Sequence, residues 1–112
     1  MSEKFSTNLS DAQRERLAII GEEMGEALQA VGKILRHGYD SWNPTVVGAT
    51  VNREDLSREL GHVRYAIQML INAEDVTNDA IVFAELEKER KIKRWLHFQA
   101  GSPTPARDRR GE

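Results

Sequence analysis

The sequence predicts an all-α fold made of three long helices. In three segments, apolar residues recur at intervals of three and four, the spacing that places them on one face of a helix. Stretches rich in glycine, proline and small polar residues separate these segments, and no stretch of useful length alternates as a β-strand does. A chain of 112 residues supplies one modest core, so we expect an incomplete helical bundle that homo-oligomerisation completes.

The first helix is expected from Ser10 to about Arg36. Ser10 is a good N-cap residue, and Gln13 can reach back to it from three positions later, which is the pattern of a capping box. The apolar positions that we expect to face the core are Leu17, Ile20, Met24, Leu28, Val31 and Leu35.

Three glycines, Gly21, Gly25 and Gly32, lie inside this helix. Each costs roughly 1 kcal/mol relative to alanine. They fall on one flank of the apolar stripe, within about 40° of one another in projection. We interpret them as packing residues that let another helix approach closely.

A connecting loop is expected over 37–51, where Gly38, Pro44 and Gly48 break the helical pattern. A second helix is expected over 52–73, packed against the first, with an apolar stripe made of Leu56, Leu60, Val63, Ile67 and Leu70.

A third helix is expected after a cap at Thr77 or Asn78, and it should run to about Gln99. Its apolar positions are Ile81, Leu86, Ile92, Trp95 and Leu96. We therefore divide the chain into a flexible N-terminus over 1–9, a helical domain over 10–99 and a tail over 100–112. The tail is rich in proline, glycine and charge and is expected to be disordered.

The composition narrows the classes of function. No apolar run approaches the roughly 20 residues that a membrane span needs, and the N-terminus lacks the apolar segment of a secretory signal, so we expect a cytoplasmic protein without membrane contact. Without cysteine, any metal ion must be held by carboxylate or imidazole groups. A net charge of −2 gives no global reason to bind nucleic acid.

Carboxylates gather beside the apolar stripe of the first helix. Glu23 and Glu26 are three residues apart, so both can reach one point above the helix, whereas Glu22 lies farther round. On the second helix, Glu59 projects close to the apolar stripe and His62 follows at the same spacing. Two readings stay open at this point: an oxygen-rich site for magnesium or manganese, or exposed glutamates paired with basic residues along the helix.

Three segments in order, "LAIIGEEMGEALQAVGKILRHG", "NREDLSRELGHVRYAIQMLI" and "KERKIKRWLHFQ", resemble the MazG-like all-α nucleoside triphosphate pyrophosphohydrolases, in particular the small forms of phages and bacteria. The likeness covers about residues 8–99. The EExxE motif of the family is complete here as Glu22, Glu23 and Glu26. If the chain is encoded by a phage, the expected location is the host cytoplasm.

The resemblance implies a helical homodimer or homotetramer that binds Mg²⁺ and splits a nucleoside triphosphate into a monophosphate and pyrophosphate. An ExxE pair on the first helix and an ExxD pair on the second supply the metal ligands in that family. Carried over, these ligands are Glu23, Glu26 and Glu59, with Glu22 a candidate catalytic residue that orients the attacking water.

His62 stands where the family has its fourth carboxylate, in the segment "ELGH". Replacing a carboxylate with an imidazole removes one negative charge, so the affinity for Mg²⁺ should fall. His62 itself would then ligate a softer ion such as Mn²⁺ or Zn²⁺, or Asp55, one turn before Glu59, would compensate with its carboxylate. The loop over 37–51 is also longer than in compact members of the family.

Basic and aromatic residues complete the expected site. Lys33 lies on the glutamate side of the first helix, and Lys88, Lys91 and Arg94 repeat every three residues along the third; we expect them to bind phosphates. Trp42 or Trp95 can stack on a base, although a tryptophan near a helix end is more often part of a core.

Two further classes of function remain as alternatives. A binding module would keep the fold but lose its chemistry through His62, and would act as a nucleotide-binding or helical protein-interaction module. Nucleic-acid binding through "KERKIKR" has little support, because the same helix also carries Glu85, Glu87 and Glu89.

Overall fold

The computed structural model describes residues 6–99, and all regular secondary structure within that range is helical. The three helices are α1 (Asp11–His37), α2 (Asn52–Asn72) and α3 (Asn78–Ile92). They form two units, one ending at Asp75 and the other beginning at Val76. The predicted all-α class is thus confirmed; the predicted C-terminal tail, and residues 1–5 of the predicted N-terminus, lie outside the described residues.

The capping box predicted at the start of α1 is confirmed. The backbone N–H of Gln13 donates to Ser10 Oγ at 3.0 Å, and the backbone N–H of Ser10 donates to Gln13 Oε1 at 2.8 Å. At the other end Gly38 adopts a φ of 90°, which favours glycine, and its N–H donates to the carbonyl of Ile34 at 2.7 Å. These contacts satisfy backbone groups that the helix itself leaves without partners.

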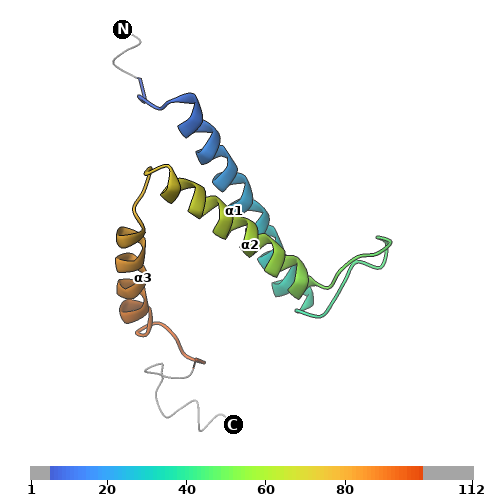
Figure 1. The fold of residues 1–112 in the computed structure, drawn as a ribbon. Coiled ribbons are helices and arrows are strands. Elements are labelled where there is room, and N and C mark those ends of the chain that lie inside the picture. Colours follow the sequence, from blue (N-terminus) through green and yellow to red (C-terminus); the bar gives the residue numbers. More distant parts are fainter. Residues whose placement is uncertain (1–5, 100–112) are drawn as a thin grey trace. The chain divides into compact units, whose positions relative to one another are not determined.

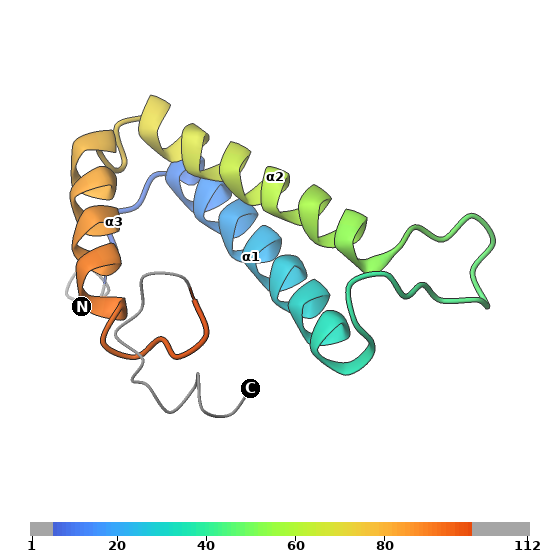
Figure 2. The same ribbon diagram turned by 90° about the horizontal axis from the view of Figure 1, so that it is seen from below.

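Helices α1 and α2 pack side by side in opposite directions (Figures 1 and 2). Their buried residues are mostly small: Ala27 and Ala30 on α1, and Ala66 on α2, together with Leu70. Small side chains at the contact let the two helix axes approach closely, since nothing bulky separates them. The predicted packing of the second helix against the first is confirmed.

The face of α1 that packs on α2 is not the predicted one. Of the predicted stripe only Ile20 is half-buried, while the other five residues are exposed, up to 82% for Leu35. The contacting face carries Glu23, Ala27 and Ala30 and lies about a quarter turn away in projection. Helix α1 therefore has two adjoining faces, and within the first unit α2 leaves the more strongly apolar one uncovered.

The interior glycines of α1 do not serve the contact with α2. A Cβ atom added at Gly21 or Gly25 would meet nothing within 4 Å, and at Gly32 it would meet only the end of Arg36, at 3.5 Å. The interpretation of these glycines as packing residues is therefore wrong for the contact between α1 and α2. They border the uncovered apolar face instead.

The loop between α1 and α2 is closed at its base by hydrogen bonds. The N–H groups of Asn52 and Arg53 donate to the carbonyls of Ser41 and Tyr39, both at 2.8 Å, and the buried Asn52 side chain donates to the carbonyl of Gly38 at 3.0 Å. Val51, at the N-cap of α2, has no side chain able to cap the helix, so carbonyls of the loop take over that role. The loop extends beyond the paired helices (Figures 1 and 2).

The C-terminal end of α2 turns the chain sharply and presents a carboxylate to α1. Glu74 adopts a φ of 63°, its N–H donates to Ile71 at 3.0 Å, and the N–H of Asp75 donates to Leu70 at 2.9 Å, which together make a Schellman motif. Arg16 donates two hydrogen bonds to Asp75, from Nε to Oδ2 at 2.6 Å and from Nη2 to Oδ1 at 3.2 Å. The guanidinium holds the pKa of Asp75 below its ordinary value.

The second unit contains α3, which begins where expected and ends early. Thr77, rather than Asn78, is the cap, and its Oγ1 accepts from the N–H of Ala80 at 3.2 Å. The helix stops at Ile92, seven residues short of the prediction, and the next N–H groups, of Arg94 and Trp95, bond only three residues back. Trp95, His97 and Phe98 lie among the next residues, and each favours helix less than alanine or leucine, which weakens the last predicted turns.

In the described part of the chain, none of the helices combines the length and apolar character needed to cross a membrane.

Candidate functional site

Four ionisable side chains meet where α1 faces α2. Glu23 and Glu26 come from α1, and Glu59 and His62 from α2. Each pair is separated by three residues, so both members project from the same side of their helix. One potential ligand atom from each residue lies within 4.8 Å of the others, so the structure brings together all four residues that the sequence suggested as metal ligands. We call this group the carboxylate cluster.

Two oxygens of the carboxylate cluster are buried and lack hydrogen-bond donors. Glu23 Oε1 and Glu59 Oε1 have almost no contact with solvent and accept no hydrogen bond within the described residues. Their side chains are only 22% and 15% exposed. A buried carboxylate oxygen without a donor is costly, because it has given up water and gained nothing in return. The arrangement therefore suits a positively charged ligand.

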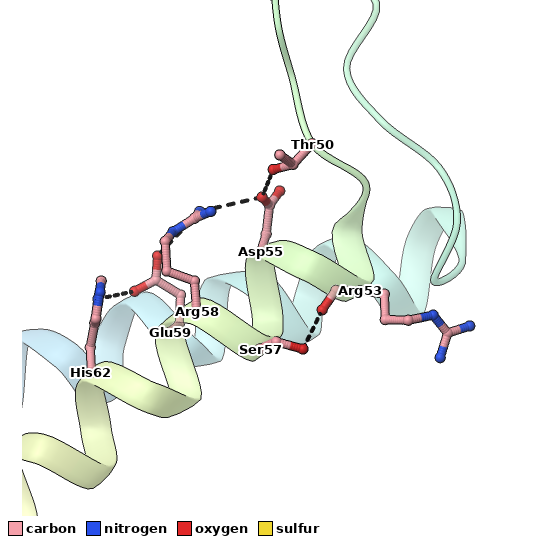
Figure 3. A network of polar contacts seen from close by, with 7 residues as sticks. All are labelled: Thr50, Arg53, Asp55, Ser57, Arg58, Glu59 and His62. Carbon is pink, nitrogen blue, oxygen red and sulfur yellow. Dashed lines mark hydrogen bonds and ion pairs between the residues drawn. The ribbon is translucent and has the colours of Figure 1, made fainter.

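His62 contacts both of these carboxylates from the edge of the cluster. Its Nδ1 lies 3.3 Å from Glu59 Oε1 (Figure 3) and 3.5 Å from Glu23 Oε1, and its side chain is about half exposed. The residue that departs from the family pattern thus occupies the position expected of a fourth ligand. A neutral imidazole offers one nitrogen lone pair to an ion, and a protonated imidazole would instead neutralise part of the carboxylate charge.

Repulsion among the carboxylates raises the pKa of Glu26. The charge of Glu59 is the largest cause that raises the pKa of Glu26 above its ordinary value, followed by desolvation and by the charge of Glu23. Like charges held this close favour the protonated form of one partner. A bound cation relieves the same repulsion.

A chain of polar contacts continues from the cluster toward the loop. Arg58 Nη2 lies 3.6 Å from Glu59 Oε2 and donates to Asp55 Oδ1 at 3.3 Å, and the hydroxyl of Thr50 donates to the same Asp55 oxygen (Figure 3). Asp55, considered above as a substitute ligand, therefore already has two donors and lies outside the four-residue cluster. Arg58 links the cluster to the start of α2.

A cleft of about 240 Å³ opens beside the cluster, lined by Glu26 and Glu59 and by two cationic side chains, Lys33 and Arg58. Lys33 was expected from the sequence as a phosphate ligand. Arg58 was missed, although its place three residues after Asp55 and directly before Glu59 identifies it as a cation beside the acidic face.

A larger cavity of about 860 Å³ lies next to this cleft and shares Lys33, Arg58, Asn52 and Asp55 with it. The loop forms much of its wall, including Trp42.

The remaining predicted site residues do not join the cluster. Glu22 is exposed and is not one of the four grouped side chains. Lys88 and Lys91 lie on α3 and Arg94 just beyond it, so these three, like Trp95, belong to the second unit, and phosphate binding by them stays a prediction.

Comparisons of the chain with protein-family models, with curated proteins and with solved structures gave no match. The chemistry of the site therefore has to be argued from its residues. Three carboxylates and one imidazole around a common point can hold a divalent cation, and the two cationic side chains next to them can hold an anion.

Proposed function

We propose that the chain is a metal-dependent nucleoside triphosphate pyrophosphohydrolase that converts a nucleoside triphosphate to the monophosphate and pyrophosphate. The observation that carries the proposal is the carboxylate cluster, in which two buried carboxylate oxygens have no hydrogen-bond donor. The motif resemblance described above supplies the reaction class. A site that joins uncompensated carboxylates to neighbouring cations suits a ligand made of a divalent ion and a polyphosphate.

Glu23, Glu26 and Glu59 would hold the ion, with His62 as the fourth ligand. Hard carboxylate oxygens suit Mg²⁺, and the imidazole shifts the preference toward Mn²⁺. When bound, the ion would supply Lewis-acid stabilisation of the charge that develops on the phosphate oxygens. The donor set fits such an ion, since the buried oxygens of Glu23 and Glu59 accept no hydrogen bond from the described residues.

The other residues of the cleft act on the phosphates and on water. Lys33 and Arg58 line the cleft beside Glu26 and Glu59, where they would bind and orient phosphate oxygens. Lys88, Lys91 and Arg94 are further candidates for the same role. Glu22, next to the ligand Glu23 in the chain, would orient the attacking water and accept its proton.

The active form that we propose is a homodimer or homotetramer. Leu28 is 71% exposed and Leu35 82% exposed on the uncovered face of α1, and the glycines beside them leave room for another helix. An apolar face of this kind marks an interaction surface, and a second copy of the chain supplies a matching one.

The assembly is tested by light scattering of native protein and of Leu28→Glu. We expect an oligomer for the native chain and a smaller species for the variant, because a charge would enter the apolar contact. Val47→Glu, a substitution at a fully exposed loop position, is the control and should leave the mass unchanged. A native protein that is monomeric at micromolar concentration would contradict the oligomer.

The activity is tested by measuring pyrophosphate release from a panel of canonical and modified nucleoside triphosphates, with Mg²⁺ and with Mn²⁺. We expect turnover that Glu59→Gln abolishes and that Glu54→Gln, the same change on an exposed part of α2, leaves intact. Absence of turnover with either ion for every nucleotide would reject the enzyme.

The second candidate is a nucleotide-binding module without turnover, and one observation favours it. His62 contacts the carboxylates of both Glu23 and Glu59, so a protonated imidazole would neutralise part of the negative charge of the cluster without a metal ion. Nucleotide binding without pyrophosphate release would select this candidate.

A further inference from the structure

The larger cavity is built by the segment that departs most from compact members of the resembled family. It lies between the C-terminal end of α1, the loop and the start of α2, and its volume of about 860 Å³ is in the range of pockets that hold small organic ligands. The hydrogen bonds that Asn52 and Arg53 donate to the carbonyls of Gly38, Tyr39 and Ser41 hold both ends of the loop next to each other. The wall is thus largely formed before any ligand arrives.

Further contacts hold the loop in shape between those anchors. Asn43 Oδ1 accepts from the N–H and the hydroxyl of Thr45, at 3.0 and 2.7 Å, around Pro44. Thr50 is tied to Asp55 at the start of α2. A pre-organised loop loses less conformational entropy when a ligand binds.

The lining of the cavity combines cations with a flat aromatic surface. Lys33, Arg36 and Arg58 are cationic at neutral pH and face a single carboxylate, that of Asp55. Trp42 contributes an indole ring that is 58% exposed although it is part of the wall. An exposed tryptophan in a cationic cavity suits a ligand that is both anionic and aromatic.

The linings of the two cavities indicate how such a ligand would be oriented. Lys33 and Arg58 line both cavities, Glu26 and Glu59 line only the smaller cleft, and Trp42 lines only the larger cavity. An elongated ligand that spans both would therefore have its charged end at the shared cations and its aromatic end at Trp42.

We propose that the larger cavity is the nucleoside subsite of the enzyme: Trp42 stacks on the base, and Arg36 joins the shared cations Lys33 and Arg58 in binding the phosphates that lead to the carboxylate cluster. The identity of the ligand as a nucleoside triphosphate rests on the proposed function. The position of the base in the loop cavity rests on the cavity itself. In this proposal, the loop over 37–51 determines which base the enzyme accepts.

The chain carries only two tryptophans, Trp42 and Trp95, so Trp95→Phe leaves Trp42 as the sole tryptophan reporter. In that variant we expect a nucleoside triphosphate to quench the emission of Trp42 on binding, because the base stacks on the indole. Inorganic tripolyphosphate, which has the phosphates but no base, should bind with little change in emission. A hydrolysis-resistant α,β-methylene nucleotide keeps the measurement free of turnover.

Affinity measured by calorimetry then separates base from phosphate recognition. Trp42→Ala should weaken nucleotide binding by roughly tenfold or more, the usual effect of losing one stacking partner, and should leave tripolyphosphate binding unchanged. Trp42→Phe should recover most of the loss. Trp95→Ala is the matched control and should bind both ligands as the native protein does. Helix content by circular dichroism checks that each variant is folded.

The outcomes distinguish this inference from the proposed function. If Trp42 governs nucleotide affinity and no pyrophosphate is released, the nucleoside subsite stands and the enzyme is rejected. If pyrophosphate is released and Trp42→Ala binds nucleotide as tightly as native protein does, the enzyme stands and the subsite is rejected. Equal binding of nucleotide and tripolyphosphate by the native protein, or no nucleotide binding, also overturns the subsite.

Discussion

The pair formed by α1 and α2 has two charged contacts, and they differ in how their charge is balanced. Near the end of α2, Arg16 holds Asp75 in a two-bonded ion pair, and each group has the partner that it needs. Within the pair, Glu23, Glu26 and Glu59 meet, and the contacts that offset their charge are the half-exposed His62 and one Arg58 nitrogen at 3.6 Å from Glu59. Burial is similar in both places, with side chains of Asp75 and Glu59 both 15% exposed.

The comparison teaches how to tell a structural contact from a ligand site. A contact that serves the fold is complete within the chain, as the lowered pKa of Asp75 shows. The carboxylate cluster is not balanced in this way within the described residues, and repulsion from Glu59 and Glu23 raises the pKa of Glu26. The predictions below test that distinction, beginning with the largest expected effect.

Glu59→Gln should remove most of the affinity for a divalent ion. Loss of a group that merely supports a metal ligand costs about 10- to 100-fold in affinity, so loss of a ligand should cost more than that. The measurement is Mn²⁺ binding by electron paramagnetic resonance, with Glu54→Gln as the control on the same helix. Equal Mn²⁺ affinity in the two variants would show that the cluster is a structural contact after all.

His62→Asp should raise the affinity for Mg²⁺, by about tenfold, and reduce the preference for Mn²⁺, because it adds a hard, charged oxygen ligand. Mg²⁺ and Mn²⁺ titrations by calorimetry give both affinities, and His97→Asp in the second unit is the control. If His62→Asp changes neither affinity, Asp55→Asn in the native background tests whether that carboxylate compensates. Loss of Mg²⁺ binding there would assign the compensation to Asp55.

Asp75→Asn should lower the free energy of unfolding at neutral pH. The pKa of Asp75 is lowered in the folded state, so its ion pair stabilises the protein above the ordinary value of 3.8, and this stabilisation disappears as the pH falls through the folded-state pKa. Urea unfolding of native protein and variant at several pH values should show a difference that closes in acid. A difference that persists at the lowest pH would point to a cause other than the charge.

Glu26→Gln should raise the free energy of unfolding at neutral pH, by less than Asp75→Asn lowers it. The pKa of Glu26 is raised, so repulsion lowers stability as the pH rises through that value, and the neutral amide removes the repulsion. Without metal ion the variant should melt higher than native protein at neutral pH, and the two should converge below 4.5, the ordinary value. Saturating Mn²⁺ should reverse the order, because only the native cluster is complete.

The sequence predicts much of the fold because local signals are strong where helices begin. The capping box at Ser10 and the cap at Thr77 both appear in the structure, and α2 ends within one residue of the expected position. The predicted end of α3 was wrong because residues 93–99, which include Trp95, His97 and Phe98, were counted as helix. The predicted contact face of α1 was wrong because the prediction followed the large apolar side chains, whereas the contact with α2 is made by alanines.

The sequence predicted which side chains meet in the carboxylate cluster but did not predict the cavity beside it. Spacing along one helix brings Glu23 to Glu26, and Glu59 to His62, since helix geometry alone fixes those pairs. The cavity depends on the path of the loop, which is set by tertiary hydrogen bonds from Asn52 and Arg53 that no local pattern announces. Arg36 and the cavity walled by the loop were missed for that reason, whereas the spacing of Arg58 from Asp55 and Glu59 was a local signal that went unused.

The closed base of the loop makes residues 42–50 an exchangeable module. Because the bonds from Asn52 and Arg53 hold the chain together at Gly38, Tyr39 and Ser41, the segment beyond them can change in sequence or length while both helices keep their places. Doubling the length of a flexible loop adds only about 0.6 kcal/mol of closure cost. The wall of the larger cavity can therefore change by replacement of this segment while the carboxylates on α1 and α2 keep their places.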